Sequence, residues 1–250
     1  LYDQIITEME DIALIRRLIG SRKGLRILEP FCGTGRMLIP LALDGHSVVG
    51  LDRAQGMLDR AQTKVRALPP EVQGRVTLLR ADVLRERWPV GFDLVILGGN
   101  CLYELATPTE QTQVIASAAS ALRPGGHLFV DNDHMEGELD RSWYDPPVCE
   151  GVFPTGECAD GTRLESQWRV IWHDAPRRLI LFLRQTSIIL PNGSVIEREY
   201  VQQKHPVSAT EVAHWLGDQG LTVEHMLGDY EGHPYTDSAP RAIFWARKIE

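Results

Sequence analysis

The sequence predicts an α/β protein with a doubly wound, mostly parallel sheet of seven strands and an inserted antiparallel β meander. Three observations support this fold class. Short apolar runs alternate with amphipathic helical patterns through the first half of the chain. Three β-like runs follow, and two of them flank an Asn-Gly turn, which is a strong hairpin signal. A capped helix and two further apolar runs then complete the chain.

The first half supplies five strands and the helices between them. Runs this short and this apolar are typical of parallel strands buried on both faces. Pro124 ends the third helix and the next two glycines supply a turn. An amphipathic helix is expected before the first strand. We expect strands at 25–28, 47–51, 76–79, 94–97 and 127–130, and helices at 35–44, 55–67 and 110–122.

The second half begins with a Pro- and Gly-rich stretch, 140–161, which is expected to be a long loop, with room for short strands. The meander strands are expected at 164–172, 179–190 and 195–203, with Gln185 opposite Tyr200. Ser208 and Glu211 form a capping box for a helix that ends at Gly220. An antiparallel pair at 221–227 and 242–247 completes the sheet. We therefore expect a core of 1–135 and 205–250, with 136–204 inserted as a substrate cap.

Composition narrows the functional classes. The 250 residues carry a formal charge of -8, and 43% of them are hydrophobic. This acidity argues against a nucleic-acid partner, and no apolar run is long enough for a membrane helix. The four cysteines lack C-x-x-C spacing, and the N-terminus lacks a signal-peptide pattern, so a cytoplasmic protein with reduced thiols is expected. A zinc site at Cys149, Cys158 and His173 lacks ligand spacing, so no metal is expected.

The motif ILEPFCGTGR, residues 27–36, carries the strongest functional signal. An apolar strand ends in the carboxylate of Glu29 and then turns through Gly33-Thr34-Gly35 into a helical segment. Glycines allow the backbone to approach a ligand, and free N–H groups at a helix start face its polar atoms. The dinucleotide fingerprint G-x-G-x-x-G is met only in part, because Leu38 stands at its third glycine.

Three further pieces follow at the ends of later strands, where open α/β sheets bind ligands. Asp52 is expected to accept hydrogen bonds from a ribose, and the alternative is that it caps the next helix. Nearby Met57 either covers an adenine face or packs in the core. Asp82 either binds an adenine amino group or lies in a solvated loop. The expected cofactor-binding residues are Glu29, Gly33, Thr34, Gly35, Asp52, Arg53, Met57, Ala81, Asp82, Val83 and Gly98.

Taken together, the segments ILEPFCGTGR, VVGLDRAQGMLDRA, ADV, FDLVILGGN and LRPGG resemble the class I S-adenosylmethionine (SAM)-dependent methyltransferases. The resemblance covers about 25–132 and the closing pair of strands. It implies a Rossmann-like methyltransferase fold, SAM as cofactor and S-adenosylhomocysteine (SAH) as product. Pro30 departs from the family's usual glycine. The meander and the pair Tyr2-Asp3 loosely resemble the branch of glycine/sarcosine and amino-sugar N-methyltransferases.

The chemistry that this resemblance implies is in-line methyl transfer to a small-molecule acceptor, with nitrogen favoured over oxygen. An amine acceptor must lose a proton, so a base near neutrality is useful. His134 and Asp133, after the fifth strand, are the expected catalytic residues, and the alternative is a solvated surface loop. The expected substrate-binding residues are Asn100, Tyr103, Trp168 and Tyr200.

The meander offers a weaker signal. Ser166, Trp168, Gln185, Tyr200 and Gln202 are expected to share one face. Such a face could form the roof of a substrate pocket or the contact surface of a homodimer. The alternative is that Trp168 simply packs in the core. Two other functions stay open at the level of sequence. One is a nicotinamide-dependent oxidoreductase on a Rossmann sheet, and the other is a protein with the SAM-binding fold that does not catalyse.

Overall fold

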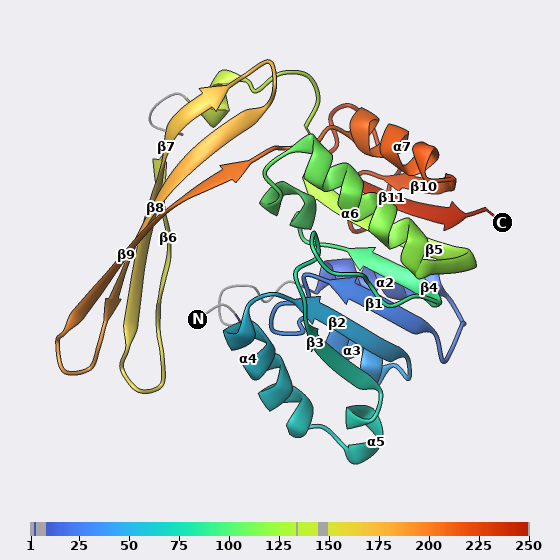
Figure 1. Ribbon diagram of the computed structural model, residues 1–250, viewed down its shortest axis with the longest axis horizontal. Coiled ribbons are helices and arrows are strands. Elements are labelled where there is room, and N and C mark those ends of the chain that lie inside the picture. Colours follow the sequence, from blue (N-terminus) through green and yellow to red (C-terminus); the bar gives the residue numbers. More distant parts are fainter. Residues whose placement is uncertain (1–2, 4–8, 134, 145–149, 250) are drawn as a thin grey trace. The chain divides into compact units, whose positions relative to one another are not determined.

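The computed structural model describes residues 3, 9–133, 135–144 and 150–249. The chain divides into two compact units (Figure 1). The larger unit comprises Met9–Leu102, Thr109–His134 and Ser208–Glu250, and the smaller unit comprises Leu1–Glu8, Tyr103–Pro108 and Met135–Val207. Among the described residues, no helix is long and apolar enough to cross a membrane.

The larger unit contains a seven-stranded sheet in the order β10-β11-β5-β4-β1-β2-β3. Neighbouring strands from β5 to β3 run parallel, whereas β11 is antiparallel to both β5 and β10. The predicted fold class is therefore confirmed. The strands are β1 (Arg26–Pro30), β2 (Ser47–Asp52), β3 (Val76–Arg80), β4 (Phe92–Leu97), β5 (Leu122–Asp133), β10 (Leu221–Leu227) and β11 (Arg241–Lys248).

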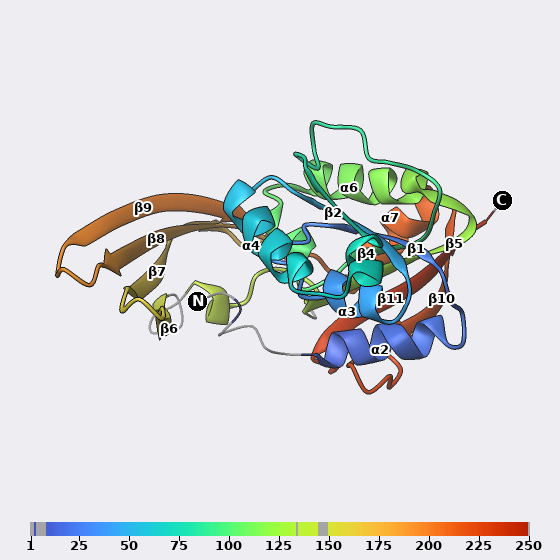
Figure 2. The same cartoon turned by 90° about the horizontal axis from the view of Figure 1, so that it is seen from below.

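Helices cover both faces of this sheet: α2 and α3 lie on one face, and α6 and α7 on the other (Figure 2). On α2, Ile12, Ile15 and Ile19 recur at helical spacing and are buried against Phe129 and Trp245 of the sheet. The predicted capping box of Ser208 and Glu211 starts α7. The helices are α2 (Glu10–Ile19), α3 (Leu38–Leu43), α4 (Gln55–Arg66), α5 (Pro70–Gln73), α6 (Pro108–Ala121) and α7 (Ala209–Asp218).

The smaller unit contains a four-stranded antiparallel sheet whose strands follow chain order. These strands are β6 (Glu150–Glu157), β7 (Arg163–Asp174), β8 (Leu179–Ile189) and β9 (Val195–Lys204). Strand β6 occupies part of the stretch expected to be mainly loop. It is an edge strand, and its pairing with β7 shifts register between Phe153 and Gly156, where Pro154 lies. An edge position with a bulge tolerates a proline that a central strand would not.

The expected register of the meander is wrong by one residue. Arg184, and not Gln185, lies opposite Tyr200, because the β8–β9 loop holds five residues and Leu190 N–H bonds to Ser194 O at 2.8 Å. A bulge after Val170 shifts the β7–β8 pairing as well, so Trp168 also faces Arg184. A slip of one residue moves a side chain to the opposite face of a sheet. Gln185 therefore bonds to Gln167 and Glu199 on the other face.

Candidate functional site

The predicted cofactor residues gather at the carboxyl ends of four adjacent strands. Strand β1 lies between β4 and β2, and the chain leaves it toward β2 before it later returns to β4. This is the point in an open α/β sheet where the strand order reverses, and ligands bind in the crevice beside it. Glu29 is the penultimate residue of β1, and Gly33 and Gly35 follow in the turn toward α3. The fold therefore brings the sequence motif to the expected edge.

Asp52 joins three of these strand ends. Its Oδ2 accepts the backbone N–H of Gly33 at 2.9 Å, and its Oδ1 accepts that of Ala54 at 2.8 Å. Its backbone carbonyl accepts the N–H of Ala81 at 3.0 Å, just after β3. Each carboxylate oxygen keeps a second acceptor site after one such bond. Asp52 thus fixes the glycine turn and the start of α4, and it retains capacity for a ribose hydroxyl.

Glu29 is a buried carboxyl group with unsatisfied hydrogen-bonding capacity. Its Oε2 lacks a hydrogen-bond partner among the described residues. Burial raises the pKa of Glu29 to about 8, and the nearby Arg36 guanidinium opposes part of that rise. Arg36 itself is held by Asp11 of α2, at 2.9 Å and 2.5 Å. A buried acceptor beside a fixed guanidinium can receive a ligand that carries both an ammonium and a carboxylate.

Glycines keep the same edge open. Gly33 has φ +52, and a Cβ added there would meet nothing within 4 Å. At Gly98, after β4, a Cβ would lie 2.8 Å from Met37 Cε. A side chain at Gly98 would therefore displace Met37, which is buried under the turn. The left-handed φ of Gly33 and the close approach at Gly98 explain why both positions favour glycine.

The other predicted cofactor residues occupy the same edge with different exposure. Thr34 is fully buried, and Lys64 of α4 donates to its Oγ1 at 3.0 Å. Asp82 Oδ1 accepts the N–H of Leu84 at 3.0 Å in a tight turn. Arg53 is exposed and Met57, on the first turn of α4, is half-buried. Ala81 is half-buried and Val83 buried. The role of these residues in binding the cofactor is a proposal.

At the ends of β4 and β5, Asn100 and Asp133 form a reciprocal pair. Asn100 Nδ2 donates to Asp133 Oδ2 at 2.7 Å, and Asp133 N–H donates to Asn100 Oδ1 at 2.6 Å. Asn100 has φ +61, in the left-handed region that asparagine adopts more readily than most other residues, and its two bonds to Asp133 hold this conformation. The predicted residues Asn100 and Asp133 are thus in direct contact.

Arg241 of β11 binds two carboxylates of β5. Its Nε donates to Asp131 Oδ1 at 2.7 Å, and its Nη1 donates to Asp133 Oδ1 at 2.6 Å. Tyr230 donates to Asp131 Oδ2 at 2.9 Å, and Gly99 N–H reaches the same oxygen at 3.2 Å. Burial raises the pKa of Asp131, and Arg241 opposes the rise. Arg241 thus bridges two carboxylates, of which Asp131 is fully buried and Asp133 is exposed.

Four predicted site residues remain to be described. His134 is outside the described residues. Tyr103 is buried in a short 3-10 helix, Cys101–Glu104. In the smaller unit, Trp168 packs edge-on against Phe182 with ring centroids 5.4 Å apart. Tyr200 is exposed, and Arg184 Nη1 donates to its hydroxyl at 3.3 Å.

Sequence reasoning missed four partners of these residues. Arg36 is the last residue of the glycine motif, and its positive charge could have indicated that it binds a ligand carboxylate. Asp11 is a helical acid without any local signal. Tyr230 and Arg241 reach Asp131 across 99 and 110 positions of the chain. No local pattern indicates such distant partners.

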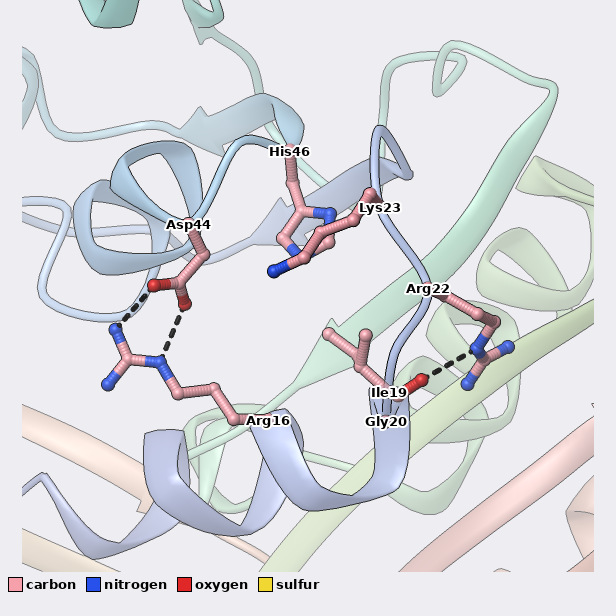
Figure 3. A pocket seen from close by; sticks show the side chains of 7 residues that line it. All are labelled: Arg16, Ile19, Gly20, Arg22, Lys23, Asp44 and His46. Carbon is pink, nitrogen blue, oxygen red and sulfur yellow. Dashed lines mark hydrogen bonds and ion pairs between the residues drawn. The ribbon is translucent and has the colours of Figure 1, made fainter.

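A shallow pocket also lies at the opposite, amino-terminal edge of the sheet (Figure 3). Two of the positively charged side chains that line this pocket already have partners. Arg16 binds Asp44 at 2.6 Å, and Arg22 donates to the carbonyl of Ile19 at the end of α2. His46 Nδ1 accepts the N–H of Leu25, and burial lowers the pKa of His46. These contacts secure the end of α2, so we assign this pocket no chemistry.

The carboxyl-edge residues fit SAM. The cofactor carries an ammonium, a carboxylate, a ribose and an adenine. The unpartnered oxygen of Glu29 suits the ammonium, the Arg36 guanidinium suits the carboxylate, and the remaining acceptor sites of Asp52 suit the ribose. The open space at Gly33 lets the backbone approach a ligand closely.

Comparison with known proteins agrees with this chemistry. Residues 27–126 match a family described as a methyltransferase domain. The cypemycin N-terminal methyltransferase of a Streptomyces species is 25% identical over 213 residues, covering 85% of this chain and 79% of that protein. Residues 27–126 thus form a methyltransferase domain, and the chain is a SAM-dependent methyltransferase. Its cofactor is SAM, which sets aside the nicotinamide oxidoreductase.

Solved methyltransferases share the fold across the whole chain. A SAM-dependent methyltransferase from Clostridium acetobutylicum is 14% identical with a TM-score of 0.75, covering 100% of this chain and 96% of that one. The sugar N-methyltransferase KedS8 from Streptoalloteichus is 19% identical with a TM-score of 0.71, covering 100% and 93%. This methyltransferase therefore keeps the architecture of its relatives, including the added antiparallel sheet, at low sequence identity.

Proposed function

We propose that this methyltransferase transfers the methyl group of SAM to a nitrogen atom of a small polar metabolite. The observation that carries the proposal is the exposed carboxylate of Asp133 at the end of β5. The side chain of Asp133 is 51% exposed, whereas Asp131, which shares Arg241 with it, is fully buried. An exposed carboxylate at the edge of the cofactor site attracts a cationic amine.

In this proposal, SAM supplies a methyl group on a positively charged sulfur, which leaves as a neutral thioether in SAH. Glu29, Arg36 and Asp52 hold the cofactor, and the rigid turn Gly98–Asn100 lines the site. Much of the rate acceleration comes from holding the reactants in line at short distance. Asp133 draws in the protonated amine, and His134 takes its proton near neutral pH.

Names of relatives support nitrogen without settling the acceptor. By name, the cypemycin enzyme is an N-terminal methyltransferase and KedS8 is a sugar N-methyltransferase. Matches over a shorter length, 109 residues, include a ubiquinone biosynthesis O-methyltransferase of Pseudomonas putida. Oxygen is therefore the second candidate acceptor. A homodimer, a cytoplasmic location and a cap role for 136–204 stay predictions.

The test is a screen with SAM carrying a deuterated methyl group against amines, alcohols, phenols and carboxylates, with products identified by mass spectrometry. We expect label on nitrogen and formation of SAH. Asp133→Asn and His134→Ala should each lower turnover about tenfold or more with SAH affinity unchanged. Asp237→Asn, an exposed aspartate in the β10–β11 loop, is the matched control. Label found on oxygen alone contradicts the proposal.

A further inference from the structure

Asn132 is an unusual residue in β5. Only 1% of its surface is exposed, and neither its Oδ1 nor its Nδ2 has a hydrogen-bond partner among the described residues. An amide buried without partners destabilises the folded state, because it has lost its hydrogen bonds to water without replacing them. Unsatisfied groups of this kind are rare in native proteins and call for a specific explanation.

The direction of the Asn132 side chain follows from its neighbours. Asp131 and Asp133 both bind Arg241, so they share one face of the strand. Successive side chains of a strand point to opposite faces, which places Asn132 on the other face, with Leu128 and Val130. That is the face covered by α6 and α7 (Figure 2). Asn132 therefore has no access to the Arg241 cluster.

The backbone at Asn132 is fixed on both sides. Asn132 pairs with Ala242 of β11. The residue before it, Asp131, is bonded to Tyr230 and Arg241, and the residue after it is bonded to Asn100. The strand cannot easily turn the amide out to water without breaking these contacts. The unpartnered amide is therefore held in place.

Packing alone does not explain an asparagine at this position. Leu128 and Val130, on the same face, are fully buried apolar residues. An apolar side chain at 132 would continue that pattern without the cost of an unsatisfied amide. The position also lies near the carboxyl end of β5, at the edge of the sheet where Asp52 ends β2 and Glu29 is the penultimate residue of β1. A ligand at this edge can supply the missing partners.

We propose that Asn132 binds the methyl acceptor and contributes to its selection. An amide offers one acceptor oxygen and two N–H donors, so it pairs best with a group that both donates and accepts, such as a hydroxyl or an amide. The acceptor thus carries an uncharged polar group of this class beside its nucleophilic atom. This inference rests on the proposed methyl transfer to a small polar metabolite. It adds that Asn132 recognises an uncharged polar group on that metabolite.

The test compares Asn132→Leu, which keeps the number of side-chain heavy atoms, with Gln111→Met. Gln111 is also fully buried, but its Nε2 donates to the carbonyl of Leu102 at 2.8 Å. Without ligand, Asn132→Leu should raise the melting temperature by ~2–8 °C, because it removes an unsatisfied amide. Gln111→Met should lower the melting temperature, because it breaks a satisfied bond.

The second measurement uses the best acceptor from the labelled-methyl screen. Asn132→Leu should raise its KM at least about tenfold, the effect of one lost hydrogen-bonded group, with the Kd for SAH within about twofold of wild type. A lower melting temperature for Asn132→Leu overturns the inference without any acceptor being known. An unchanged acceptor KM overturns it while methyl transfer itself stands. Transfer to oxygen alone would contradict the proposed nitrogen acceptor and leave the KM comparison intact.

Discussion

The carboxylate of Asp52 accepts the backbone N–H of Gly33 at 2.9 Å, and this bond ties the end of β2 to the glycine turn after β1. The two residues are 19 positions apart in the chain. A single acid thus shapes the loop that approaches the cofactor, and it keeps acceptor capacity for a ribose. Loss of the Asp52 carboxylate should therefore affect SAM and SAH alike, because both carry the same ribose.

We expect Asp52→Ala to weaken binding of both ligands about tenfold to a hundredfold, which corresponds to ~1–3 kcal/mol. Calorimetric titration with SAM and SAH measures this directly. Asp59→Ala, which removes an exposed aspartate of α4, is the control and should leave both affinities near wild type. Unchanged affinities in a folded Asp52→Ala protein would show that Asp52 serves only the loop and the start of α4.

Glu29 should make stability depend on pH. Its folded pKa, about 8, lies above the ordinary 4.5, so the folded protein binds the additional proton between those values. Stability therefore falls as pH rises through this window. Glu29→Gln removes the titrating group and should melt several degrees above wild type at pH 9, with a smaller difference at pH 5. Glu71→Gln, on exposed α5, should show no such trend. If the melting temperatures of Glu29→Gln and wild type change in parallel with pH, the claim that Glu29 is buried and binds a proton in the folded state is wrong.

Cofactor binding should release protons at neutral pH. An ammonium beside Glu29 stabilises the ionised carboxylate and lowers the pKa of Glu29 from about 8. The heat of SAH binding at pH 7 should then differ between phosphate and Tris buffers, whose ionisation enthalpies differ. Glu29→Gln should lose most of that difference. Identical heats in both buffers for wild type would place the ammonium of SAH away from Glu29.

Arg241 should be important for stability as well as for the site. It binds the fully buried Asp131, and removal of one partner from a buried ion pair costs ~3–5 kcal/mol. Arg241→Gln should lower the melting temperature by on the order of 10 °C. Adding Asp131→Asn should recover part of the loss, because no unpaired charge is left. Arg16→Gln breaks the exposed pair with Asp44 and should change stability by about 1 kcal/mol or less. Equal effects of Arg241→Gln and Arg16→Gln would show that burial of Asp131 does not matter.

Much of this architecture could be predicted from local sequence. Apolar runs and helical periodicity identified the seven strands of the main sheet, because burial on both faces leaves an apolar run at each of them. The motif around Glu29 and the spacing to Asp52 brought the cofactor residues to one edge. The short helix α5 was not expected, and β6 lies in a stretch that was expected to be mainly loop with room for short strands. Each has weak periodicity, and β6 forms through pairing with β7.

Other features depend on contacts that no local pattern encodes. The meander register depended on one additional residue in the β8–β9 loop and on a bulge after Val170. The cluster at Asp131 depends on Tyr230 and Arg241, which arrive through the closing strands. The unpartnered amide of Asn132 depends on which face of β5 it occupies. These features follow from tertiary structure, and they include the residues that define the acceptor side.

The most direct test of the account is calorimetric titration of the wild-type protein with SAH, SAM and NAD under identical conditions. The account predicts one site per chain for SAH and for SAM, and no binding of NAD, because the Glu29 edge suits an amino-acid ammonium and carboxylate. Binding of NAD, or no binding of SAH to the folded protein, would contradict the central claim that this edge of the sheet holds a SAM-dependent methyltransferase site.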